Sequence, residues 1–195
     1  MNYTDILHSP DSANIRAVKA ILVITASWLI ALSAQVSLNL PFSPVPITGQ
    51  TLGVLLCGII LGRNLGAAAV GAYLLQGAAG LPVFAGARSG LAVLLGPTGG
   101  YLFGFLAAAY IVGVLAELPY RRSPFQAALT LLLGNLIIYA FGLVRLARFV
   151  GESQALQLGF YPFLIGDGLK LALAVLLVSG SGWLIDIFQE RSESS

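Results

Sequence analysis

Residues 20–62 read AILVITASWLIALSAQVSLNLPFSPVPITGQTLGVLLCGIILG, a run of 43 residues without a charged side chain. A transmembrane helix needs roughly 20 consecutive, mostly apolar residues, so this run is long enough for two crossings. Three prolines between residues 41 and 46 divide it, and proline breaks a helix and holds the preceding residue extended. We therefore predict a helix over 17–39, a proline-rich loop, and a second helix over 48–62.

The rest of the chain continues the pattern of apolar segments separated by proline, glycine and charge. A cleaved signal peptide at 20–40 is disfavoured, because its apolar core would be too long and further hydrophobic segments follow. We expect an all-α integral membrane protein, a six-transmembrane-helix bundle that forms a single membrane domain over residues 1–195. The remaining helices are predicted over 65–80, from Pro97 or Thr98 to 118, over 125–146 and over 162–188, with the bundle spanning about 17–188 and polar tails at 1–15 and 189–195.

The composition excludes several classes of protein. Ten basic and eight acidic side chains make up 9% of the 195 residues, whereas an ordinary soluble domain carries about 25% charged residues. So few charges cannot coat a globule of this size, which excludes a water-soluble monomer, and a chain this apolar is not disordered. The net charge of +2 provides no basic face for a nucleic acid.

Enzyme chemistry finds little support in the sequence. Cys57 is the single cysteine, which excludes an internal disulfide and a Cys-based zinc site. His8 is the single histidine and lies in the N-terminal tail, so no histidine is available in the membrane for a Ser–His dyad or a metal site. No phosphate-binding GxxxxGK[ST] loop occurs. We expect neither an enzyme nor a bound cofactor, and uphill transport would draw its energy from a partner or an ion gradient.

Basic residues predict the orientation of the bundle, because cytoplasmic loops of membrane proteins are enriched in Lys and Arg. With the N-terminus inside, six basic residues fall on the cytoplasmic side and three on the other, which favours both termini in the cytoplasm. The inner set is Arg16, Lys19, Arg63, Arg121, Arg122 and Arg191, and the outer set is Arg88, Arg145 and Arg148.

Small residues recur at helical spacing, which allows membrane helices to approach closely. Gly58-x-x-x-Gly62 is best explained by packing within the bundle. The first helix carries Ala20, Ser27 and Ala31 on one such face. This face either packs within the bundle or docks another membrane protein, and our prediction is docking.

Two charges lie well inside a hydrophobic segment, in Gly166-Asp-Gly-Leu-Lys170. Each would cost roughly 2.5–3.5 kcal/mol at a helix centre, and Asp167 and Lys170 share a helix face because they are three residues apart. They form either an ion pair that satisfies only itself or a polar site for a small ligand. Such a ligand would be a zwitterion, or a molecule with N–H donors and a carboxylate.

Four more polar residues are candidates for the same site. Arg88 is a solvated loop charge or a third polar contact, and Asn135 must find a partner in the ligand or in another helix. Tyr139 lies one turn after Asn135 and shares its face. Gln50 can cap its helix or reach the site. The predicted binding set is Asp167, Lys170, Asn135, Arg88, Tyr139 and Gln50.

Four motifs appear in order along the chain: PFSPVPITGQT at 41–51, GLPVF at 80–84, LGPTGGYLFG at 95–104 and GDGLK at 166–170. Together they resemble the BioY family, the biotin-specific substrate-binding subunits (S components) of prokaryotic energy-coupling-factor (ECF) transporters. Each motif alone is weak, and their order and spacing make the resemblance specific over about 40–188.

The resemblance implies a six-helix bundle in the cell (inner) membrane that binds biotin near its outer face. Asp167 and Lys170 match the family residues that line this site, and the loops before the second and fourth helices would close over the ligand. Where the family has a glycine-rich run, this chain has Gly86-Ala-Arg-Ser-Gly90, so Arg88 is a ligand contact or a substitution particular to this chain.

The resemblance also implies partners: a transmembrane coupling subunit and two ATP-binding-cassette ATPases, although some family members operate without the full set. Two other classes of function stay open. One is a structural or assembly protein in which Asp167 and Lys170 only lock the bundle, and the other is a small-solute channel.

Overall fold

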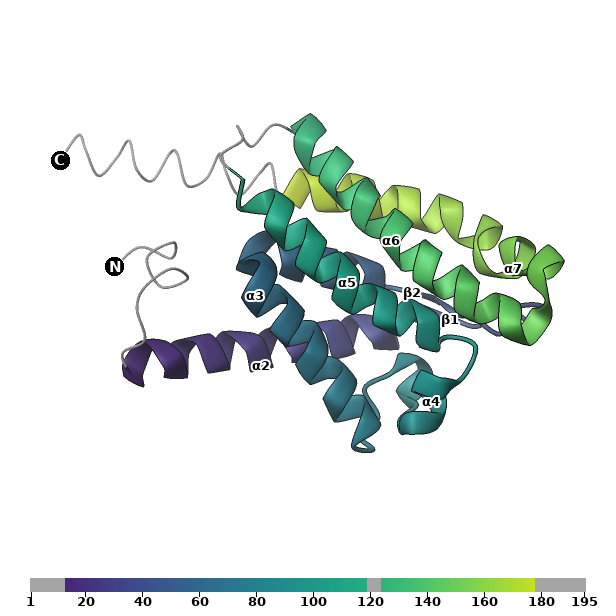
Figure 1. The fold of residues 1–195 in the computed structure, drawn as a ribbon, viewed down its shortest axis with the longest axis horizontal. Helices are drawn as coiled ribbons and strands as arrows, with labels where there is room; N and C mark the ends of the chain where they lie inside the picture. Colours follow the sequence, from purple (N-terminus) through teal and green to yellow (C-terminus); the bar gives the residue numbers. More distant parts are fainter. Residues whose placement is uncertain (1–12, 119–123, 178–195) are drawn as a thin grey trace.

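The computed structural model describes residues 13–118 and 124–177, which form a bundle of helices with one small antiparallel ribbon (Figure 1). The helices are α2 (Ala13–Gln35), α3 (Gln50–Ala78), α4 (Leu91–Leu95), α5 (Gly99–Ala116), α6 (Pro124–Val150) and α7 (Glu152–Gly159), followed by a helix over 164–177; the strands are β1 (Ser37–Leu38) and β2 (Ile47–Thr48), and short 3-10 turns lie at η1 (Ala85–Ala87) and η2 (Tyr161–Phe163).

The described residues contain five helices that are long and apolar enough to cross a membrane. This confirms the predicted all-α membrane architecture. The spans are Asn14–Gln35, Gln50–Ala78, Gly99–Ala116, Pro124–Val150 and Glu152–Leu177. The predicted helices over 48–62 and 65–80 are joined within α3.

α3 is folded back on itself at Gly62, whose backbone takes φ +76° and ψ 178°. Glycine adopts such a positive φ without the steric cost that other residues meet. The reversal brings Gly66 against the start of its own helix, where a methyl group on Gly66 would lie 2.8 Å from the Cys57 carbonyl oxygen. The side chain of Gln50 likewise reaches Tyr73 on the opposite arm. The two arms of α3 therefore run antiparallel and in contact.

The acidic residue that follows the last residue of α5 secures the reversal in α3. The carboxylate of Glu117 accepts a hydrogen bond from the Arg63 backbone N–H at 2.8 Å and pairs with Arg63 Nε at 3.2 Å. It thus satisfies a donor that the first turn of a helix leaves unpaired. The side chain also lies beside Gly62, so α5 fixes the position of the turn.

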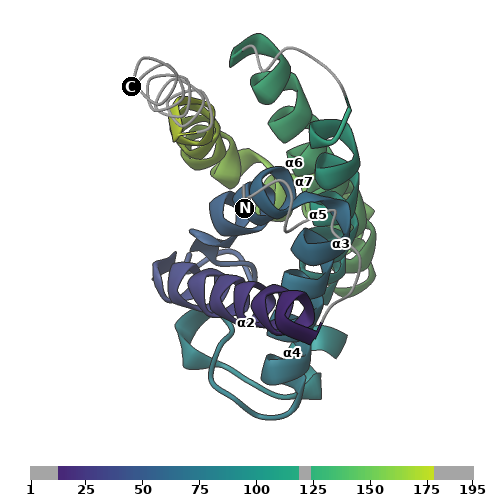
Figure 2. The ribbon, with the colours of Figure 1, turned by 90° about the vertical axis from the view of Figure 1, so that its left-hand side faces the viewer.

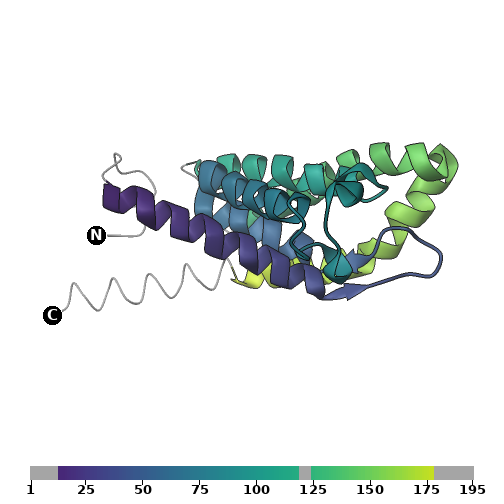
Figure 3. The same cartoon turned by 90° about the horizontal axis from the view of Figure 1, so that it is seen from below.

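Helix packing follows the order of the chain: α2 lies on α3, α5 lies between α3 and α6, and α7 packs on α6. Figures 2 and 3 show α2 along one side of the bundle. The ribbon, α4 and α7 gather at one end, and the start of α2 and the C-terminal end of α5 lie at the other (Figures 1 and 3). We call the end with the ribbon the ribbon end.

Several predicted boundaries are wrong at the ribbon end. The first helix stops at Gln35 rather than 39, because Ser37 and Leu38 pair with Thr48 and Ile47 and so satisfy their backbone groups in a ladder. The proline-rich loop is the connection between these strands. The helix predicted over 125–146 is α6, and it reaches Val150.

The polar stretch at 145–157 and the loop before α5 also contain helix that the sequence did not predict. After a single glycine, Gly151 at φ +85°, the chain forms α7. α4 occupies the whole segment between Gly90 and Gly96. The first helix begins at Ala13 rather than at 17, so residues 13–15 of the predicted N-terminal tail are helical. The rest of both polar tails, residues 119–123, the end of the last predicted helix and Arg191 lie outside the described residues, as do Arg121 and Arg122.

The docking prediction for the first helix is wrong for two of its three residues. Ser27 is fully buried and Ala31 is 4% exposed, and Gln76 Nε2 on α3 donates a hydrogen bond to Ser27 Oγ at 3.0 Å. Only Ala20 is exposed. The small residues let α2 approach α3 closely, which is the packing role that small residues usually play in membrane bundles.

Candidate functional site

A cavity of about 590 Å³, part of it open to solvent, lies at the ribbon end among β2, α3, α5, α6 and the helix over 164–177. Its walls combine aromatic and aliphatic side chains with a few polar groups, as small-molecule sites do. The apolar wall includes Val45, Phe84, Phe105, Ile138 and Phe163, and the polar lining is Thr48, Gln50, Thr51, Arg88, Thr98, Tyr101, Tyr139, Asp167 and Lys170.

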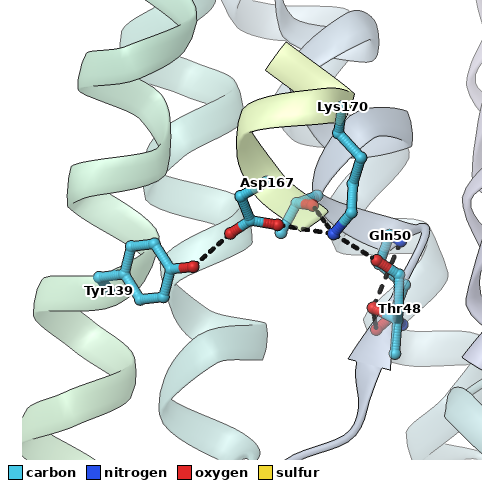
Figure 4. Close-up of polar contacts among 6 residues, drawn as sticks. Thr48, Gln50, Tyr139, Asp167 and Lys170 are labelled. Carbon is cyan, nitrogen blue, oxygen red and sulfur yellow. Dashed lines mark hydrogen bonds and ion pairs between the residues drawn. The ribbon is translucent and has the colours of Figure 1, made fainter. Parts of the chain in front are cut away.

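The carboxylate of Asp167 has a partner on each oxygen (Figure 4). Oδ1 accepts a hydrogen bond from Lys170 Nζ at 2.6 Å, and Oδ2 accepts one from the hydroxyl of Tyr139. Asp167 is 8% exposed, so its charge depends on these donors for stabilisation. The predicted ion pair is present, and Tyr139 joins it from α6.

Lys170 makes three hydrogen bonds with its ammonium group. Besides Asp167, Nζ donates to the carbonyl oxygen of Thr48 at 2.7 Å and to Oγ1 of Thr51 at 3.1 Å. A lysine ammonium has three donors, so all of them are used within the chain. Lys170 thereby ties the last described helix to the junction between β2 and α3.

Gln50 lies at the start of α3 and is 5% exposed. Its Oε1 accepts a hydrogen bond from Thr48 Oγ1 at 3.0 Å, and its Nε2 donates to the hydroxyl of Tyr73. The side chain lines the cavity, so of the two predicted roles the structure places Gln50 at the site.

Arg88 lies at the exposed edge of the cavity and lines it. Its Nε donates to the carbonyl oxygen of Ala85 at 3.1 Å. In the described part of the chain the two terminal nitrogens of the guanidinium have no acceptor. Arg88 therefore presents a cation with unused donors to anything that enters the cavity.

Asn135 does not line the cavity, although it lies one turn from Tyr139. It is 6% exposed, and its Oδ1 has no hydrogen-bond partner among the described residues. The structure thus brings five of the six predicted residues to one cavity and leaves Asn135 outside its lining.

The aromatic wall of the cavity was not predicted, because the sequence analysis proposed only polar side chains for the site. Tyr101 and Phe105 lie on one face of α5 at i and i+4, and Tyr139 packs edge-on against Phe160 at 4.8 Å between ring centroids. The i, i+4 spacing of two aromatic residues is a signal in the sequence that could have identified this wall.

The arrangement suits an amphipathic small molecule. The inner polar cluster offers an anionic acceptor beside the amide of Gln50, aromatic walls bury an apolar body, and Arg88 provides a cation at the rim. Among residues 13–118 and 124–177, no group of three or more His, Cys, Asp or Glu side chains could hold a metal ion.

Comparisons with known proteins show the family of the chain. The family model described as the BioY family matches residues 8–185. The biotin transporter BioY of Thermotoga maritima is 43% identical over 157 residues, which cover 80% of this chain and 86% of the relative. The biotin transporter BioY of Rhizobium etli is 39% identical over 169 residues, with 80% and 89% of the two chains covered.

A solved structure has the same fold. The crystal structure of the S-component for biotin from an ECF-type ABC transporter matches with a TM-score of 0.75 and 27% identity, covering 87% of this chain and 93% of that one. These relatives are transporters, which confirms the expectation of a transport protein rather than an enzyme. The resemblance of the four sequence motifs is confirmed, and the chain belongs to the BioY family.

Proposed function

We propose that this protein binds biotin in the ribbon-end cavity and serves as the substrate-specific component of an ECF-type transporter. The observation that carries the proposal is the Tyr139–Asp167–Lys170 cluster, which borders an apolar-walled cavity in a BioY-family chain. The proposed binding set is Gln50, Arg88, Tyr139, Asp167 and Lys170, and it leaves out Asn135, which does not line the cavity.

The hydrogen bonds favour one orientation of biotin. Biotin carries a ureido group with two N–H donors and a carbonyl at one end, and a carboxylate at the other. Because Lys170 already uses all three of its donors, it is a poor partner for a new carboxylate. Arg88 has free guanidinium donors at the rim, and such a group can bind a carboxylate in a bidentate manner. The ureido ring then lies toward Asp167 and Gln50.

The folded-back α3 supports six membrane crossings. Its first arm, Gln50–Leu61, is about 18 Å long at 1.5 Å per residue, whereas the hydrocarbon core is about 30 Å thick. A crossing made by this arm therefore begins below the membrane surface, and the ribbon and its proline-rich loop complete it. This depth would place Gln50 and Lys170 away from bulk water.

Both termini are proposed to lie in the cytoplasm, with the ribbon end outside. Two of the three basic residues at the ribbon end have local roles that explain their place there. Arg88 lines the cavity, and the guanidinium of Arg145 donates to the Leu95 carbonyl at the end of α4. Because local contacts explain these two basic residues, they are not evidence for the opposite orientation under the positive-inside rule.

The partners proposed for the chain are a transmembrane coupling subunit and two ATP-binding-cassette ATPases in a prokaryotic cell (inner) membrane. The sequence has no phosphate-binding loop of its own, so ATP-driven transport by this chain needs ATPase subunits. The lipid bilayer covers the apolar outer faces of the helices, on which side chains such as Leu75 and Leu132 are exposed.

Titration calorimetry of the purified protein tests the proposal. Biotin is expected to bind with submicromolar affinity, which corresponds to more than about 8 kcal/mol. Lipoic acid is the control ligand, because it shares the five-carbon acid tail and a sulfur ring but lacks the ureido group. A structural protein would bind neither ligand, and a channel would pass biotin into liposomes without retaining it.

A further inference from the structure

Gln35 is the last residue of α2, and it contacts the loop over 83–88 with both ends of its amide. Nε2 lies 3.3 Å from the carbonyl oxygen of Val83 and 3.3 Å from that of Phe84. Oε1 accepts a hydrogen bond from the backbone N–H of Ala87 at 3.1 Å. Nε2 also donates to the Ala31 carbonyl of its own helix at 3.2 Å. One side chain thus fastens three positions of the loop to α2.

The loop that Gln35 contacts carries two residues of the cavity. Phe84 is 1% exposed, lines the cavity and packs edge-on against Tyr73 with ring centroids 5.5 Å apart. Arg88 lines the rim. The Phe84 N–H donates to the Arg88 carbonyl at 3.0 Å, which closes the loop between them. The two cavity residues are therefore joined through one hydrogen-bonded loop.

The backbone of the loop depends on support from outside. Ala87 has φ +55°, in the left-handed region, and Gly86 before it has φ +67°. A non-glycine residue in this region is uncommon and persists where its surroundings hold it. Gln35 Oε1 accepts the hydrogen bond that the backbone N–H of Ala87 donates. Gln35 therefore contacts the loop at its strained residue.

We propose that Gln35 is a positioning residue of the ligand site: it holds the 83–88 loop so that Phe84 and Arg88 face the cavity. Gln35 itself does not line the cavity, and its effect on binding acts through these two residues. The inference rests on the proposed function, because it assigns the contact with the ligand carboxylate to Arg88.

The chemistry of the contact requires an amide. The two loop carbonyls need a donor and the Ala87 N–H needs an acceptor, and glutamine offers both at the end of one side chain. Glutamate keeps the acceptor but places a negative charge beside two carbonyl oxygens. Methionine keeps the length and shape of the side chain and removes every strong hydrogen bond.

The test compares Gln35→Met and Gln35→Glu with wild type by titration with biotin and with biotin methyl ester, which lacks the carboxylate charge. Gln154→Met is the matched control, because Gln154 is an exposed glutamine on α7 at the same end of the bundle.

Both Gln35 variants are expected to bind biotin at least tenfold more weakly, while the control binds as wild type does. The loss for the methyl ester is expected to be smaller than for biotin, since the misplaced Arg88 matters most for the charged group. The unfolding temperature of the ligand-free protein should stay near that of wild type.

Three outcomes would overturn the inference. Wild-type biotin affinity in both Gln35 variants would show that the loop needs no fastening. A parallel loss of unfolding temperature would assign Gln35 to the stability of the bundle. Equal losses for biotin and its methyl ester would remove the link to Arg88. Failure of the proposed function gives a different result, because wild-type protein would then not bind biotin in the same titration.

Discussion

Nζ of Lys170 lies 2.6 Å from Oδ1 of Asp167, three residues earlier on the same helix. The pair is mostly shielded from solvent, with side chains 19% and 11% exposed. Its other donors and acceptors come from α6 and from the junction of β2 and α3, so three parts of the chain meet at these two charges. A change at either residue is therefore expected to affect both the cavity and the packing around it.

Asp167→Asn and Lys170→Ala are each expected to weaken biotin binding by more than tenfold, or about 1.4 kcal/mol. The first leaves the Lys170 ammonium without its counter-charge, and the second leaves the carboxylate with Tyr139 alone. Removing one partner of a buried pair strands the other charge, so the unfolding temperature should fall as well. Glu152→Gln, at an exposed acidic residue on α7, is the control for charge alone. Calorimetry that gives wild-type affinity for both variants would refute the assignment of the site.

Tyr139→Phe separates the hydroxyl from the ring. The phenyl group keeps the edge-on contact with Phe160, and only the hydrogen bond to Asp167 is lost. A hydrogen bond to a charged group contributes about 1.5–3 kcal/mol, so a loss of biotin affinity of roughly tenfold to a hundredfold is expected, with little change in the apolar wall. Tyr161→Phe at an exposed position is the matched control. Equal affinities for the two variants would show that the hydroxyl does not prepare Asp167 for the ligand.

Gly66→Ala tests the folded-back α3. Alanine is the better helix former by about 1 kcal/mol, but its methyl group would lie 2.8 Å from the Cys57 carbonyl oxygen on the other arm. Overpacking of this kind typically costs about 1–3 kcal/mol, so the unfolding temperature in detergent should fall. Gly71→Ala is the matched control, since nothing lies within 4 Å of a methyl group there. A Gly66→Ala protein as stable as the control would mean that the two arms do not touch.

The sequence predicted the apolar helices and the polar cluster because each has a local signal. Charge-free runs and prolines mark the helices, and a charge within an apolar segment is costly enough to point to a function. Asp167 and Lys170 were predicted in this way. Tyr139 was predicted because it shares a helix face with Asn135, and Gln50 and Arg88 because they lie beside or within loops on the same side of the bundle. The strand pairing of Ser37 with Thr48 depends on a contact across the proline loop, which no local pattern shows.

The errors concern contacts between segments distant in sequence. Ser27 and Ala31 have the composition of a docking face, but that composition is the same for packing inside a bundle, and only the position of α3 decides between the two. Asn135 was predicted from its polarity within an apolar helix. Its place outside the cavity lining depends on the rotation of α6, which a one-turn spacing from Tyr139 does not fix.

The final prediction concerns the orientation of the bundle in the membrane. Phe42 lies in the proline-rich loop at the ribbon end and is 58% exposed, and Asn64 is exposed beside the reversal in α3 near Glu117 at the other end. In a Cys57→Ala background, each position is replaced singly by cysteine and whole cells are treated with a membrane-impermeant thiol reagent. Arg63 precedes Asn64 in the chain, and Arg16 and Lys19 belong to the first turns of α2, which starts at the same end of the bundle (Figure 1). The positive-inside rule therefore places that end in the cytoplasm. Phe42→Cys should therefore be labelled from outside, and Asn64→Cys only after the membrane is permeabilised. The reverse pattern would place the cavity on the cytoplasmic side, where a protein that captures biotin from outside the cell could not use it.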